Sequence, residues 1–241
     1  MIPDGVALAL SKLARVLFIL AIPTFLVTSN VRLAFDSLSL YGYGFEQHNV
    51  VGNTGLNMDQ LMSIAAEIIH YFNSSEELLD VKVFIGENQF TLFNHGEVLH
   101  MRDVKGLLQA VHKVQLVTGI YILGTLLIML VLTRGTCIRM LAGQILTGSL
   151  LSIILLLLGG LGSVLGFDQI FDQFHALSFN SGTYTFDPRY NYLTRLFTEG
   201  FFMQATLFIS LSVTLQALLL ALLAFGIRRV ASNKAISGAA T

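Results

Sequence analysis

The sequence predicts a mainly α-helical membrane protein, with four transmembrane helices and a mixed α/β extracytoplasmic cap formed by two outer loops. Of its 241 residues, 54% are hydrophobic and 12% are charged, whereas soluble globular domains carry about 25% charged residues. A bilayer core about 30 Å thick needs roughly 20 apolar residues in a helix. Four runs reach that length, and we expect a single membrane domain over 1–241 with helices at about 13–31, 114–132, 140–167 and 200–227.

The distribution of lysine and arginine predicts the orientation, because cytoplasmic loops carry an excess of both. Seven basic residues lie in short segments that all fall on one side of the membrane: Lys12, Arg15, Arg134, Arg139, Arg228, Arg229 and Lys234. Both termini are therefore expected in the cytoplasm. The two longer loops, at about 33–112 and 168–199, should form the cap outside. The first run has no A-x-A-like cleavage site, so we interpret it as a retained helix rather than a signal peptide.

Three segments of the first outer loop have distinct patterns. Residues 33–55 are aromatic and glycine-containing, and we expect them to be irregular. Residues 58–72 keep the i, i+3, i+4 spacing of an amphipathic helix, and Asn57 with Gln60 resembles a capping box. Residues 81–85 and 89–93 flank Gly86-Glu87-Asn88, a pattern typical of a β-hairpin with a three-residue loop.

The densest cluster of ionisable residues, 92–105, follows that hairpin. Asn94 and Glu97 match the N-cap and N3 positions of a helix that continues into the second apolar run, because no proline intervenes. On that helix His100 and Asp103 share a face, and Glu97 lies one turn earlier. Carboxylates placed in this way can fix the tautomer of an imidazole and raise its basicity.

A second histidine occupies an equivalent place after the third apolar run. Asp172 and His175 are three residues apart, which repeats the pairing in reverse order if the segment is helical. Ser181-Gly182 is expected to break that helix. Pro188 suits the start of another helix at about 188–198.

Three classes of function remain open for the two histidines. The first is acyl or group transfer with imidazole as general base and acid, without an enzyme nucleophile, since no G-x-S-x-G motif occurs. The second is a metal site, although H-E-x-x-H and other close ligand pairs are absent. The third is a transporter or binding cap. Transporters usually carry polar groups at mid-depth of their spans, and the amides Gln144 and Gln216 are few for that role. A net charge of −1 gives no support for nucleic-acid binding.

The motifs around both histidines resemble one known family, the bacterial lipoprotein intramolecular transacylases (Lit). The most specific element is His100-Met101-x-Asp103-Val104-Lys105. The other matching elements are Phe93-Asn94-x-x-Glu97, Phe174-His175-x-x-Ser178-Phe179, Phe186-Asp187-Pro188, Tyr192-Leu193, Phe201-Phe202, Asn30-Val31-Arg32 and the segment from Tyr41 to Phe45.

The resemblance implies an enzyme of the bacterial cell membrane that requires no cofactor or metal. Its substrate would be a lipoprotein whose N-terminal cysteine carries a diacylglyceryl group. The sn-2 acyl chain would move to the α-amine, giving a lyso-form lipoprotein. Alternatives are a non-enzymatic membrane cap that binds an envelope lipoprotein and a metal-dependent membrane hydrolase.

The family's catalytic histidines match His100 and His175, and we expect support from Asn94, Glu97, Asp103 and Asp172. We expect substrate contacts from two groups: charged residues for the peptide part and aromatic residues for the acyl chains. These residues are Arg32, Arg102, Lys105, Tyr41, Tyr43, Phe174, Phe179 and Tyr184. The chain departs from the family pattern in having no tryptophan near Tyr184 and in having Thr198 where a proline is expected.

Overall fold

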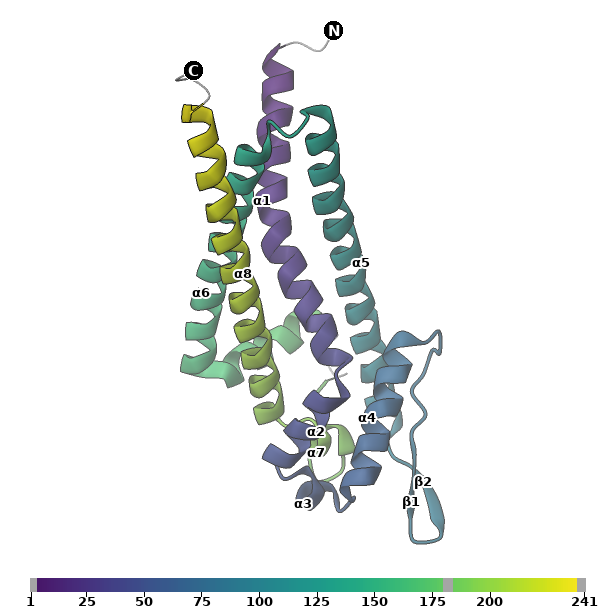
Figure 1. Cartoon of the computed structure of the whole chain (residues 1–241). Helices are drawn as coiled ribbons and strands as arrows, with labels where there is room; N and C mark the ends of the chain where they lie inside the picture. Colours follow the sequence, from purple (N-terminus) through teal and green to yellow (C-terminus); the bar gives the residue numbers. More distant parts are fainter. Residues whose placement is uncertain (1–3, 180–183, 238–241) are drawn as a thin grey trace. The chain divides into compact units, whose positions relative to one another are not determined.

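The computed structural model of the chain describes residues 4–179 and 184–237, in ten helices and strands (Figure 1). The helices and strands follow one another as α1 (Asp4–Phe35), α2 (Leu38–Gln47), α3 (Val50–Thr54), α4 (Met58–Asn73), β1 (Lys82–Ile85), β2 (Asn88–Thr91), α5 (His95–Leu132), α6 (Ile138–Ser178), α7 (Tyr192–Leu196) and α8 (Glu199–Ser237). They form two compact units. The first unit comprises Met1–Asn30, His112–Gly159 and Ile209–Thr241; the second comprises Val31–Val111 and Gly160–Phe208.

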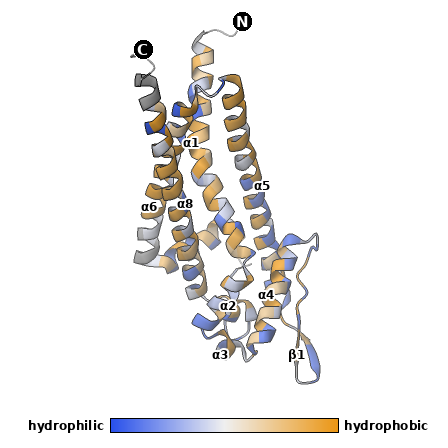
Figure 2. Ribbon diagram, viewed as in Figure 1, coloured by the Kyte–Doolittle hydropathy of each residue, from blue (hydrophilic) through white to orange (hydrophobic). Residues whose placement is uncertain are grey.

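Among the described residues, four helices are long and apolar enough to cross a membrane, which confirms the predicted number of transmembrane helices. The candidate spans are Gly5–Phe35, His95–Leu132, Ile138–Gly160 and Glu199–Ser232. Figure 2 shows apolar residues dominating the long helices, whereas polar residues are interspersed through α2, α3 and α4. The protein is therefore mainly α-helical, with one two-stranded sheet in its described part.

In the first unit, α1 contacts each of the other three long helices. Gly119 of α5 faces Phe25, and a Cβ added at Gly148 of α6 would lie 2.9 Å from the carbonyl oxygen of Ile19. In lipid, small residues at a helix interface allow two helix backbones to approach each other this closely. Between α1 and α8, the side chains of Asn30 and Gln216 exchange two hydrogen bonds, of 2.9 and 3.1 Å.

Helix α5 is continuous from the ionisable cluster into the second apolar run, as the sequence predicts. Its 38 residues correspond to about 57 Å, almost twice the roughly 30 Å of a bilayer core. The apolar residues 114–132 alone have the length of a span. Residues 95–113, which include His100, precede that apolar run.

The prediction that residues 33–55 are irregular is wrong, because they form α2 and α3. The side chain of Ser37 caps α2 by accepting a hydrogen bond from the Leu40 N–H, and one face of α2 buries Tyr41 and Phe45. Burial of that aromatic face stabilises a helix that its glycines disfavour. Gly44 is required there, since a Cβ would lie 2.4 Å from the ring of Phe201.

The expected helix at 58–72 is confirmed as α4, with both bonds of the Asn57–Gln60 capping box. The hairpin is also present, but its loop has two residues rather than three, because Ile85 pairs with Asn88. Gly86 adopts φ +65° at the first loop position, a conformation that tight hairpin turns require. Gln60 donates a hydrogen bond of 2.7 Å to the carbonyl of Phe84, which anchors the hairpin to α4.

Candidate active site

The two predicted histidines lie side by side in the second unit. His100 lies in the second turn of α5, and His175 lies in the last turn of α6. Their ring centroids are 6.1 Å apart, with an interplanar angle of 20°. The segment around His175 is helical up to Ser178. Asp172 and His175 therefore have the helical spacing that was predicted for them.

His175 is oriented by a backbone carbonyl. Its Nδ1 lies 2.8 Å from the carbonyl oxygen of Phe171, one turn earlier in α6. A carbonyl oxygen only accepts hydrogen bonds, so Nδ1 must be the protonated nitrogen of this contact. In the neutral imidazole, Nε2 then carries the free lone pair. The Phe171 ring also packs on the imidazole, at 4.2 Å between centroids.

His100 is buried among aromatic rings, with 7% of its surface exposed. Phe179 and Phe186 contact it edge-on, at centroid distances of 4.8 and 5.5 Å. Its Nδ1 is buried and has no hydrogen-bond partner among the described residues. Burial, reinforced by the nearby His175, lowers the pKa of His100 to about 4, although the negative charge of Asp103 acts in the opposite direction.

We therefore expect His100 to remain neutral as the pH falls from 8 to 5. A lowered pKa disfavours the protonated form, so charging should begin only as the pH approaches 4. The measurement is the ring ¹⁵N shift of histidine-labelled protein in detergent micelles, assigned by the signal that His100→Gln removes. A titration midpoint near 6.5, the ordinary value for histidine, would contradict the expectation.

Glu97 is buried, at 1% exposed, but its contacts differ from those expected. One carboxylate oxygen accepts a hydrogen bond of 2.8 Å from the Asn94 N–H, and the Glu97 N–H donates to the Asn94 side chain, completing the predicted capping box. The other oxygen accepts a bond of 2.7 Å from the Leu193 N–H in α7. These contacts do not support the idea that Glu97 orients the imidazole; instead, Glu97 links the start of α5 to α7.

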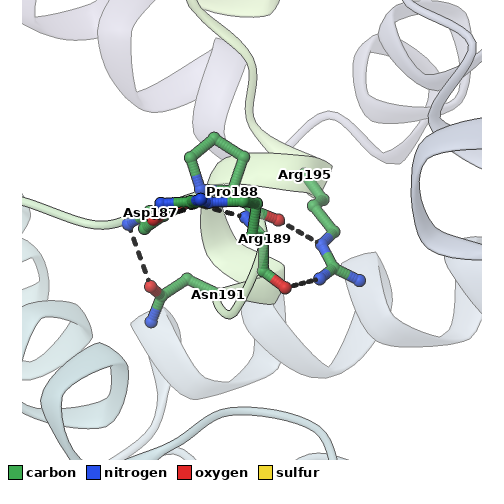
Figure 3. Close-up of polar contacts among 5 residues, drawn as sticks. All are labelled: Asp187, Pro188, Arg189, Asn191 and Arg195. Atoms are coloured by element: carbon green, nitrogen blue, oxygen red, sulfur yellow. Dashed lines mark hydrogen bonds and ion pairs between the residues drawn. The ribbon is translucent and has the colours of Figure 1, made fainter.

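The turn that precedes α7 is held by several polar contacts (Figure 3). The Asn191 side chain accepts a hydrogen bond from the Asp187 N–H, and Asp187 pairs with Arg189 at 2.6 Å. The guanidinium of Arg195 donates to the carbonyls of Pro188 and Arg189. Because of this turn, the expected helix at 188–198 is reduced to Tyr192–Leu196. Glu97 and the turn together fix the segment that presents Phe186 to His100.

The remaining predicted site residues fall into three groups: aromatic residues around His175, the two carboxylates, and five residues that lie elsewhere. Three aromatic residues surround His175, at centroid distances of 5.5 Å for Phe174, 5.5 Å for Phe179 and 5.6 Å for Tyr184. The predicted carboxylates make no hydrogen bond to either imidazole in the described part of the chain: Asp103 acts on His100 only through its charge, and the side chain of Asp172 is exposed.

The other five predicted substrate contacts lie in other surroundings. Tyr41 is buried against Phe197 and Phe201, and burial raises the pKa of its phenol. Lys105 is buried over the Tyr71 ring at 4.0 Å and donates to the Glu76 carbonyl, and burial lowers its pKa. Arg32 lies 3.4 Å from Asp36. Tyr43 and Arg102 are exposed. Their predicted roles in binding substrate remain predictions.

Sequence reasoning did not assign Phe171 and Phe186 to the site. Phe171 could have been found, because a helix through His175 places its carbonyl one turn earlier. Phe186 enters the sequence analysis only through the Phe186-Asp187-Pro188 motif, and no local pattern connects it to His100, 86 positions earlier. Thr198, near which a proline was expected, caps α8 by accepting a hydrogen bond of 3.3 Å from the Phe201 N–H.

The model of the family described as "Lipoprotein intramolecular transacylase Lit" matches residues 16–202, which include both histidines. The chain belongs to the Lit family. It is therefore an integral membrane enzyme of the transacylase class. The comparison with curated protein sequences gives no significant match.

Three solved structures of Lit from Bacillus cereus, all obtained in meso, share the fold of this Lit-family chain. The first has a TM-score of 0.74 and 20% identity, and covers 95% of this chain and 99% of that chain. The other two are histidine-substituted forms, one with arginine and one with alanine. Each has a TM-score of 0.72 and 18% identity over 95% of this chain, covering 95% and 96% of their own chains respectively.

Proposed function

We propose that this chain moves the sn-2 acyl chain of a diacylglyceryl-cysteine lipoprotein to its N-terminal α-amine, forming the lyso-form lipoprotein by two-histidine acid–base catalysis. The observation that carries the proposal is the pair of imidazoles, 6.1 Å apart and enclosed by aromatic rings. Family membership supplies the reaction class. In the balanced reaction, a carbon–nitrogen amide bond forms, the ester bond to the glycerol oxygen breaks, and one proton passes from the amine to that oxygen.

His175 is the better general base of the pair. The Phe171 carbonyl holds its Nδ1–H, which leaves the lone pair of Nε2 for the proton of the attacking amine. The same carbonyl stabilises the imidazolium that forms, because it accepts a hydrogen bond from the charged ring.

His100 suits the second role, as a neutral donor to the carbonyl oxygen and to the leaving glycerol oxygen. Its burial and lowered pKa keep the ring uncharged, and a neutral imidazole still has one N–H to donate. A donor in a water-poor site stabilises the negative charge that develops on the ester oxygen.

The aromatic residues around the pair fit an acylated substrate. Phe174, Phe179 and Tyr184 offer apolar surface to acyl chains, and because the amine and the ester belong to one molecule, catalysis depends on folding that molecule so that they meet. Arg32, Arg102 and Lys105 are the candidate contacts for its peptide part, and Tyr41 and Tyr43 for its lipid part.

The topology proposed for this reaction is a multi-pass protein of the bacterial plasma membrane with both termini in the cytoplasm. A cap formed by about 33–112 and 168–199 would then face outward. The positive residues in the short segments support this orientation.

The test is incubation of the purified protein in lipid vesicles with a synthetic diacylated lipopeptide. Transfer within one molecule leaves the intact mass unchanged. The expected result is therefore loss of reactivity toward an amine-specific label, together with N-terminal fragment ions that carry the acyl group. A lipopeptide with an acetylated N-terminus is the matched control and should not react.

Other outcomes identify the alternatives. Release of free fatty acid that a chelator stops would indicate a metal-dependent hydrolase. Binding of the lipopeptide with its amine still reactive would indicate a non-enzymatic cap. Either result would overturn the proposed acyl transfer.

A further inference from the structure

The last part of α6, residues 167–178, is an amphipathic helix that carries His175. At about 100° per residue, Phe167, Phe171 and His175 form one row along this helix. Phe167 is 8% exposed, and Phe171 packs against Phe202 at 5.0 Å. This row therefore faces the interior of the second unit.

A second row, beside the first, is apolar and open. Ile170, Phe174 and Leu177 are spaced by four and three residues, so they lie on one face. Their exposed fractions are 41%, 46% and 88%. Asp168 and Asp172 lie on the opposite side of the same helix, where both are exposed.

The chain itself indicates what covers the open row. The candidate span in α6 ends at Gly160, and only six residues, 161–166, separate it from Phe167. The seven steps from Gly160 to Phe167 reach about 10 Å as a helix and about 25 Å fully extended. The amphipathic helix therefore begins within that distance of the end of the candidate span.

We propose that Ile170, Phe174 and Leu177 contact the acyl chains of the bilayer, with the 167–178 helix lying in the membrane interface. Interfacial helices bury an apolar face about 5–10 Å into the boundary between headgroups and acyl chains and keep their polar face in water. The acidic polar face excludes attraction to anionic headgroups as the driving interaction. The apolar row supplies it.

This contact sets the depth of His175. The imidazole lies about 100° around the helix from Phe174, on the side nearer the polar face, so the helix holds it at the level where ester groups of membrane lipids occur. This consequence rests on the proposed function, whereas the lipid contact does not.

The chain contains no tryptophan, so a single introduced tryptophan reports on its own surroundings. Leu177→Trp and Ala176→Trp place the reporter at nearly the same position along the helix but about 100° apart around it. In vesicles of phosphatidylcholine brominated on the acyl chain, we expect Leu177→Trp fluorescence to be blue-shifted and quenched at least twofold more strongly than that of Ala176→Trp.

Two outcomes would overturn the lipid contact. Equal quenching with red-shifted emission in both variants would place Leu177 in water. Blue-shifted emission without quenching would place it against protein, either a second copy or another part of this chain. Leu177 is 88% exposed, so the substitution should leave folding intact, and thermal unfolding of both variants checks this.

The effect of the apolar row on the depth of His175 can be measured separately in the lipopeptide assay. Leu177→Asp is expected to lower the transfer rate in vesicles about tenfold, whereas Leu177→Met should retain it. Wild-type transfer by Leu177→Asp would overturn the role of the row in placing His175, while the quenching result would stand independently of any acyl-transfer measurement.

Discussion

Replacing either His100 or His175 by glutamine is expected to lower the rate of acyl transfer at least a thousandfold while the protein stays folded in the membrane. General acid–base catalysis contributes about 10²–10⁴-fold, and glutamine cannot take up the amine proton in place of His175. At position 100 the flexible amide of glutamine does not hold an N–H where the rigid imidazole holds it, so the preorganised donor is lost. The measurement is the rate of amine loss in the lipopeptide assay, with equal amounts of folded protein established by gel filtration.

The double variant sharpens this test. Residues that act together in one proton-transfer sequence have non-additive effects, so His100→Gln with His175→Gln should be little slower than either single variant. His70→Gln is the matched control, because that histidine lies on α4 near Glu67 and Asp80 rather than at the pair. Continued N-acylation by both single variants would remove the histidines from the mechanism.

Truncation of Glu97 should have the second-largest effect, through structure rather than proton transfer. Glu97→Ala leaves the Asn94 and Leu193 N–H groups without their acceptor. An unsatisfied buried donor costs about 1–3 kcal/mol, so we expect a loss of about 2–4 kcal/mol and a melting temperature lowered by roughly 5–10 °C. Transfer should also slow at least tenfold, because the segment that holds Phe186 against His100 is released.

Glu97→Gln separates the two carboxylate contacts. A glutamine side chain retains one acceptor oxygen but turns an NH₂ group toward the other N–H. The stability of the Glu97→Gln protein should therefore lie between those of wild type and Glu97→Ala. Glu87→Ala, in the exposed hairpin turn, is the control and should unfold like wild type. If Glu97→Ala matched that control in both stability and transfer, the link between α5 and α7 would have no role.

Local signals account for the parts of the fold that could be predicted. The four apolar runs, the capping boxes at Asn57 and Asn94, and the continuity of α5 each depend on residues within a few turns of one another. Residues 33–55 were mispredicted because α2 is stabilised by packing against residues far along the chain. The ring of Phe201 fills the space beside Gly44, and no residue near Gly44 in the sequence indicates this contact.

The site divides in the same way. The helical placement of His100 and His175 follows from local spacing, but their meeting joins residues 75 positions apart, and the family resemblance, rather than the spacing, predicted it. Glu97 was recognised as a capping residue, yet its second partner is 96 residues away. Because Glu97 is close to His100 in the sequence, its carboxylate is easily assigned to that imidazole. In the structure the carboxylate instead accepts hydrogen bonds from the backbone N–H groups of Asn94 and Leu193.

The amide pair between α1 and α8 has a consequence for synthesis of the protein. Asn30 and Gln216 are separated by 186 residues, which a ribosome adds in on the order of 10–40 s at about 5–20 residues per second. During that interval the Asn30 side chain has only its partner within α1, the Leu26 carbonyl, to which its amide donates a hydrogen bond of 2.8 Å. The two hydrogen bonds that join α1 to α8 can form only once Gln216 has been added, so this contact between the first and last long helices is a late step in the folding of the chain.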